Sequence, residues 1–100
     1  MSPDGRDSLG PIKNFIAEKS PRSDVERILC LGFCLAELCG LHEFSYSDLR
    51  RLNDDLGLRR LSNPWLAARK ARARGLVAYA GGQKMSLTAD GKAVVDLLSS

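Results

Sequence analysis

The stretch "ILCLGFCLAELCGL", residues 28–41, constrains the fold more than any other part of the chain. Its only charged residue is Glu37, and apolar side chains occur on nearly every side of a helical projection. Such a helix must be covered on more than one side, so we expect it to lie at the centre of a domain. As a helix it would span roughly 21 Å, shorter than the roughly 30 Å hydrocarbon core of a bilayer. The stretch therefore predicts a core helix and no membrane span.

This helix is predicted to begin at "SDVE", residues 23–26, and to end near Gly40. Ser23 can accept a hydrogen bond from the amide of Glu26, whose carboxylate can reach back, as in a capping box. Glycine suits the position after a helix C-terminus. The stripe expected to face the core contains Val25, Ile28, Leu31, Leu35, Leu38 and Cys39. A second stripe on the opposite side contains Cys30, Phe33, Cys34, Glu37 and Leu41.

Two ways of burying the second stripe fit the sequence equally well. The segment "LGPIKNFIAEKS", residues 9–20, predicts a short helix that is opened by Pro11 and is apolar on one side. This helix can fold back onto its own chain, or both segments can meet a second copy in a homodimer. In the dimer the interface would consist of Ile12, Phe15, Ile16, Cys30, Phe33, Cys34 and Leu41.

The length of 100 residues fits a single domain, which we place at residues 9–100. Residues 1–8 lack apolar side chains beyond Met1 and are expected to form a flexible tail. No secretory signal is found, and three cysteines without framework spacing fit reduced thiols. We expect a cytoplasmic protein, associated with the nucleoid in a prokaryote or nuclear in a eukaryote.

The histidine and the cysteines do not form a recognisable chemical site. Cys30 and Cys34 share one side of the predicted helix while Cys39 points to the other, so one ion cannot easily collect them together with His42. No nucleophile or acid is spaced with His42 as in a catalytic arrangement. We expect no catalytic residues, no metal and no cofactor, and therefore no enzyme.

The remaining sequence predicts three helices and a hairpin. "HEFSYSD" predicts a strand of one or two residues at Phe44 and then a helix capped by Ser45 or Ser47. "SNPW" begins a third helix, with Ser62 or Asn63 as the cap. "LVAYA", "GGQ" and "KMSLT" predict two strands around a glycine turn, and a last helix follows with its inward residues at Val94, Leu97 and Leu98.

These elements resemble the winged helix-turn-helix superfamily over residues 23–98. The resemblance lies in "FSYSDLRRLNDDLGL" for the first helix of the motif and "NPWLAARKARARGLV" for the recognition helix. "LVAYAGGQKMSLTADG" resembles the wing with its closing "LTxxG". The resemblance implies a mainly α fold with a small β-hairpin, an extra N-terminal helix and a C-terminal helix. It also implies that the third helix lies in the major groove of DNA and that the hairpin contacts phosphates or the minor groove.

The charge distribution supports a polyanionic partner independently of this resemblance. Residues 56–89 contain seven basic and no acidic residues, a net of +7, whereas residues 1–55 contain seven basic and ten acidic residues, a net of −3. A patch of one sign attracts a partner of the opposite sign. The candidate DNA-binding residues are Arg59, Arg60, Asn63, Trp65, Arg69, Lys70, Arg72, Arg74, Gln83 and Lys84.

The first helical positions after Pro64 are Trp65 and Leu66, where a base-reading helix usually carries polar side chains. We therefore expect contacts mainly to phosphates of double-stranded DNA, with modest sequence preference, from a transcription factor or DNA-bound accessory protein. RNA is a variant of the same hypothesis. The alternative is a winged-helix adaptor or oligomerisation module that binds protein, which an exposed Trp65 and Leu66 would favour.

Overall fold

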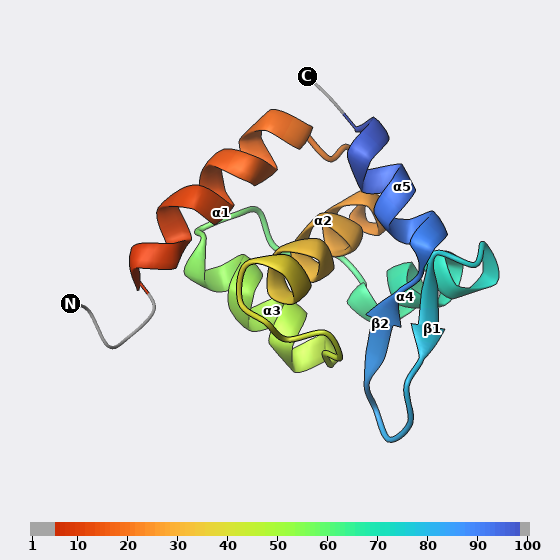
Figure 1. Cartoon of the computed structure of the whole chain (residues 1–100). Helices are drawn as coiled ribbons and strands as arrows, with labels where there is room; N and C mark the ends of the chain where they lie inside the picture. The colour runs from red at the N-terminus through yellow and green to blue at the C-terminus, as the bar shows by residue number, and fades with distance from the viewer. Residues whose placement is uncertain (1–5, 99–100) are drawn as a thin grey trace.

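The computed structural model describes residues 6–98, which form five helices and one hairpin (Figure 1). The helices are α1 (Arg6–Lys19), α2 (Asp24–Glu37), α3 (Tyr46–Asp55), α4 (Pro64–Ala73) and α5 (Ala89–Leu97). The antiparallel strands β1 (Val77–Tyr79) and β2 (Met85–Leu87) lie between α4 and α5 in the sequence. The predicted class, mainly helical with a small hairpin, is confirmed.

Helix α2 lies at the centre of the fold, as its apolar sequence predicts. It contacts all four other helices and strand β2, and nine of its fourteen residues are buried. Its N-terminus is capped by Ser23, whose hydroxyl accepts a hydrogen bond from the Glu26 amide at 3.1 Å. Within the described part of the chain, no helix combines the length and apolar character needed to cross a membrane.

The core stripe of α2 is shorter than predicted. The helix ends at Glu37, and Leu38 and Cys39, which were expected to face the core, are exposed instead. The chain leaves the helix through Gly40, whose φ of 72° is a left-handed conformation that glycine adopts without strain. Once the helix has ended, its periodicity no longer determines where these side chains point.

Helix α1 covers the second stripe of α2 within the same chain. Of the residues expected at either the intramolecular or the dimer contact, four are fully buried: Ile12, Ile16, Cys30 and Cys34. The other three are partly buried and pack against the core: Phe15, Phe33 and Leu41. The intramolecular alternative is the one found. A dimer contact at these residues stays a prediction, with four of the seven side chains already buried within the chain and three partly buried.

The N-terminal boundary of α1 also differs from the prediction. The helix begins at Arg6 and not near Leu9, and Pro11 lies inside it. A proline removes one helical hydrogen bond, and α1 accommodates this loss within its first turns. Of the predicted tail at residues 1–8, residues 6–8 are helical and residues 1–5 lie outside the described residues.

Phe44 joins the hairpin to the helical layer and confirms the predicted short strand. Its amide donates to the carbonyl of Met85 at 2.9 Å, and the Met85 amide donates to the Phe44 carbonyl at 2.8 Å. The Phe44 ring packs against Gly32 of α2, where a Cβ atom would lie 2.5 Å from the ring. The hairpin is thereby fixed at one end, and it projects from the helices at the other (Figure 1).

Helix α5 closes the fold over the base of the hairpin. The Thr88 hydroxyl caps it by accepting a hydrogen bond from the Gly91 amide at 3.0 Å. A Cβ atom on Gly91 would lie 2.1 Å from the Leu76 carbonyl oxygen, so only glycine allows this approach. The predicted inward face is found in part: Val94 and Leu98 pack against the core, whereas Leu97 is 82% exposed and the fully buried residue is Val95.

Candidate nucleic-acid interface

Helix α4 is oriented by its smallest side chains. Ala67, Ala68 and Ala71 are its buried residues, and their size lets the helix pack closely against α2. Of the two possible caps, Asn63 is the one used, and its side-chain oxygen accepts from the Leu66 amide at 3.0 Å. The long side chains of α4 therefore lie on its outer side.

The loop between α3 and α4 is held by hydrogen bonds to its backbone. The Arg59 carbonyl accepts from Asn53 Nδ2 at 3.1 Å and from the Arg27 guanidinium. The Ser62 amide donates to the Asp24 carboxylate at 3.1 Å. Because only backbone groups of Arg59 and Ser62 take part, the basic side chains of this loop stay exposed.

The basic side chains between residues 59 and 84 are all exposed: Arg59, Arg60, Arg69, Lys70, Arg72, Arg74 and Lys84. Among the side chains that the structure describes, none of these seven forms an ion pair with a carboxylate. The ion pair found there joins Lys92 to Glu37 at 3.6 Å, away from this stretch. Their charge is thus available to a partner.

A groove of about 550 Å³ lies between α4 and the hairpin, and we refer to it as the α4–hairpin groove. Apolar side chains at its base come from both elements: Ala68, Val77 and Met85. Helix α4 contributes Trp65, Arg69 and Arg72, whose i, i+4 and i+7 spacing places them along one side of the helix. The hairpin contributes Tyr79, Gln83 and Lys84, and α3 contributes Tyr46.

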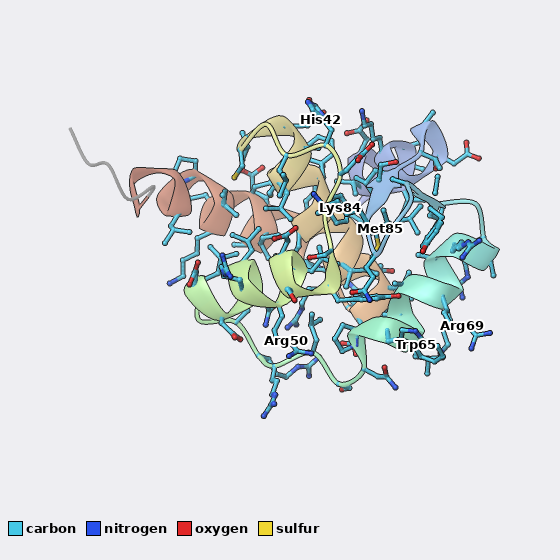
Figure 2. The ribbon with its side chains drawn as sticks, turned by 90° about the horizontal axis from the view of Figure 1, so that it is seen from below. His42, Arg50, Trp65, Arg69, Lys84 and Met85 are labelled. Atoms are coloured by element: carbon cyan, nitrogen blue, oxygen red, sulfur yellow. The ribbon has the colours of Figure 1, made fainter. Side chains whose placement is uncertain are left out.

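Two arginines of the groove stack on its aromatic rings. The Arg69 guanidinium carbon lies 4.7 Å from the centroid of the Trp65 ring, and that of Arg72 lies 5.1 Å from the centroid of Tyr79. The Tyr79 hydroxyl also donates to the Gly82 carbonyl of the turn. Trp65 and Arg69 extend away from the body of the molecule in Figure 2. These contacts hold the rings and the cations together at the surface.

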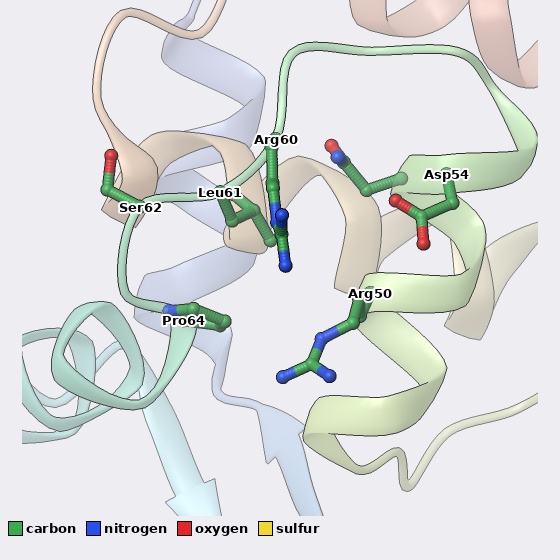
Figure 3. A pocket seen from close by; sticks show the side chains of 7 residues that line it. Arg50, Asp54, Arg60, Leu61, Ser62 and Pro64 are labelled. Atoms are coloured by element: carbon green, nitrogen blue, oxygen red, sulfur yellow. The ribbon is translucent and has the colours of Figure 1, made fainter.

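A second space, of about 700 Å³, lies between α3 and the loop that precedes α4. The side chains of Arg50 and Arg60 extend into it, and Asp54 lies at its edge (Figure 3). Asn53, which is 1% exposed, also lines it, and its side-chain oxygen has no hydrogen-bond partner. The presence of a carboxylate makes this space less basic than the α4–hairpin groove.

The structure divides the predicted binding residues into groups. It brings five of them together in the groove: Trp65, Arg69, Arg72, Gln83 and Lys84. Arg60 lies in the second space, and Asn63 serves as a helix cap. The others are exposed but line neither space: Arg59, Lys70 and Arg74.

Three aromatic or basic residues that line these sites were missed by sequence reasoning: Tyr79, Tyr46 and Arg50. Tyr79 had a usable signal, because strand alternation places it on the same face as Val77. Tyr46 and Arg50 had none, since only the packing of α3 beside the loop and the hairpin brings them to these sites.

Two of the three cysteines, Cys30 and Cys34, are buried in the core, whereas Cys39 is exposed. Burial raises the pKa of the Cys30 thiol to about 11 and that of Cys34 to about 12, so both stay protonated and unreactive at neutral pH. Within the described residues, no three histidine, cysteine or acidic side chains are grouped to hold a metal ion. His42 lies at the opposite edge of the molecule from Trp65 and Arg69 (Figure 2).

Comparisons with protein-family models, curated proteins and solved structures found no match to this chain.

Proposed function

We propose that this chain is a winged helix-turn-helix protein that binds double-stranded DNA, as a transcription factor or DNA-bound accessory protein. In this proposal α3 and α4 form the helix-turn-helix, the hairpin is the wing, and α1 and α5 are additions at either end. The order of the elements and the exposure of the outer side of α4 support this assignment.

The observation that carries the proposal is that the basic side chains of this stretch are exposed and are not paired with carboxylates of the described residues. Seven exposed basic side chains lie between residues 59 and 84, none is neutralised by a described carboxylate, and Arg69, Arg72 and Lys84 line the same groove. Guanidinium groups bind phosphate oxygens in a bidentate manner, and release of DNA counterions makes such contacts favourable. A sugar–phosphate backbone is the partner that fits this arrangement.

Base reading by α4 is expected to be limited. The side-chain oxygen of Asn63 is occupied by the Leu66 amide, and the next exposed positions are Trp65 and Leu66. These residues offer few donors or acceptors to base edges in the first turn. We therefore propose that phosphate contacts dominate and that sequence preference is modest.

Charge reversal of Arg69 and Lys70 tests the proposal. For the unaltered protein, the logarithm of affinity for a short duplex should fall with the logarithm of salt concentration at a slope of roughly −4 to −5, if four to six cations neutralise phosphates. The double variant Arg69→Glu/Lys70→Glu should lose binding while its circular dichroism stays unchanged. Fluorescence anisotropy of labelled DNA measures both effects.

A matched control places the same change of charge elsewhere. Lys13 and Arg22 are exposed on α1 and in the loop before α2, outside both spaces described above. Lys13→Glu/Arg22→Glu alters the net charge equally and should weaken binding far less. Retained binding in the α4 variant, or equal losses in both variants, would refute the proposal.

A protein-binding adaptor is the second candidate function, because Trp65 and Leu66 are adjacent and 52% and 40% exposed, and tryptophan is enriched at interface hot spots. The salt titration, run with duplex DNA, single-stranded DNA and RNA and with the mass in solution measured, separates the candidates. Stable oligomers without nucleic-acid binding would select the adaptor. A homodimer on DNA is part of the proposal, because one small domain contacts few phosphates.

A further inference from the structure

The aromatic residues of this chain are sorted by type between the core and the α4–hairpin groove. The only tryptophan and both tyrosines, Trp65, Tyr46 and Tyr79, line the groove. The three phenylalanines lie elsewhere, with Phe44 buried and Phe15 stacked on Phe33. Trp65 is 52% and Tyr79 59% exposed, so most of the apolar surface of these side chains remains in water. Exposed aromatic surface that is gathered in one place is typical of a binding site.

The charges of the groove narrow the class of ligand. Its eleven lining residues include three cations and no acidic residue. A cationic ligand is therefore repelled, and an apolar peptide would leave Arg69, Arg72 and Lys84 without partners. A flat, apolar group joined to a negative charge satisfies both the rings and the cations. A nucleotide unit has this combination.

The nucleotide must be unpaired for its base to stack on the aromatic rings of the groove. Inside a duplex each base is covered on both faces by its neighbours, and only base edges and the backbone are accessible. Stacking on a side chain needs a base that has left the helix or belongs to a single strand. The groove offers two exposed rings for this contact and the Gln83 amide as a donor and acceptor for a base edge.

We propose that the α4–hairpin groove binds an unpaired DNA base, stacked on Trp65 or Tyr79, next to the duplex that the surrounding cations hold. The protein then prefers a junction between duplex and single-stranded DNA to a continuous duplex. Arg69 and Arg72, which lie against the two rings, are placed to bind the phosphates that flank the base. This inference rests on the proposed binding of DNA and adds the form of DNA that is selected.

The test compares a blunt duplex with the same duplex carrying a single-stranded oligothymidine extension. The extended duplex should bind roughly fivefold to a hundredfold tighter, which is the range for stacking of a base on an aromatic side chain. Trp65 is the only tryptophan, so its fluorescence reports contact directly and should be quenched by the extended duplex alone.

Variants in two elements keep the test independent of folding defects. Trp65→Ala in α4 and Tyr79→Ala in β1 should each lower the ratio of the two affinities toward one. Leu66→Ala is the matched control, because Leu66 is exposed beside Trp65 but does not line the groove, and it should keep the wild-type ratio. Circular dichroism establishes that each variant is folded.

Each outcome has a distinct meaning. Equal, salt-sensitive affinities for the two DNAs overturn the inference and leave the proposed DNA binding intact. Absence of binding to either DNA overturns both. A preference that survives in Trp65→Ala and Tyr79→Ala, or that Leu66→Ala removes as well, also overturns the inference. Tighter binding of the same duplex with an oligouridine extension would overturn the assignment to DNA.

Discussion

Aromatic side chains lie on two sides of this molecule, and their surroundings differ. Between α1 and α2, Phe15 stacks on Phe33 with ring centroids 5.2 Å apart and an angle of 3° between the planes. Between α4 and the hairpin, Trp65 and Tyr79 stack on arginines, and more than half of each residue remains exposed. The first contact is complete within the chain, whereas the second leaves ring surface and charge for a partner. Exposure and the type of stacking partner therefore distinguish packing from binding here.

The two regions also differ in charge. On the α1–α2 side, buried Cys30 and Cys34 keep their thiols neutral because burial raises their pKa. On the other side, the groove gathers Arg69, Arg72 and Lys84 without a carboxylate. Stability is expected to depend on the first region and binding on the second.

The largest effect is expected from Ile12→Ala, which removes a buried side chain from the contact between α1 and α2. Ile12 is 1% exposed against α2, so the variant should lose about 2–5 kcal/mol of unfolding free energy. DNA affinity of the folded protein should be unchanged, because Ile12 lies outside the groove. Urea denaturation followed by circular dichroism measures the loss, and Asn14→Ala, exposed on the same helix, is the control. Equal stability of the two variants would contradict the contact between α1 and α2.

Alkaline pH should weaken the same region gradually, by a smaller amount for each pH unit. The pKa values of Cys30 and Cys34 are raised to about 11 and about 12, while an ordinary thiol ionises at 9.0. Above pH 9 the unfolded chain releases protons that the folded chain retains, so stability present below pH 9 is lost as the pH rises. Each thiol contributes up to about 1.4 kcal/mol per pH unit.

Denaturation at a series of pH values under reducing conditions measures this slope. Cys34→Ala should make it shallower, whereas Cys39→Ala should not, because Cys39 is exposed. Stability that stays constant or increases between pH 9 and pH 11 would show that the thiols are not buried as described.

The smallest effect is expected at the N-terminus of α4, on the open side. Asn63→Ala removes the cap on the Leu66 amide and should cost about 1 kcal/mol of stability. Ser62→Ala is the control, because Ser62 contacts Asp24 through its backbone amide, which alanine retains. Thermal denaturation of both variants measures the difference. If the two substitutions cost the same, Asn63 is not the cap.

Local signals in the sequence predicted the elements well. Ser23 begins α2, and Ser45, one of two candidates, begins α3; each accepts a hydrogen bond from the amide three residues later. The glycine turn and the single-residue pairing of Phe44 were also predicted correctly. These features depend on neighbours in the sequence, which explains why they can be inferred without the structure.

The orientation of helix faces and the contacts between elements were predicted less well. The inward face of α5 was predicted only in part: Val94 and Leu98 pack against the core, but the close approach of Gly91 to Leu76 leaves Val95 in the core and Leu97 exposed. The residues of the groove come from α3, α4 and the hairpin, so Tyr46 joins Trp65 only after these elements pack. Helical periodicity gives the relative positions of residues on one element and says nothing of the rotation of that element against another.

The sequence by itself determined that an apolar helix lies at the centre and that positive charge gathers between residues 59 and 84. Only the tertiary structure decided that α1 covers α2 within one chain and that aromatic and basic side chains share one groove. The reason is physical: burial and charge are properties that residues carry locally, whereas a contact between distant segments depends on the packing of the whole chain.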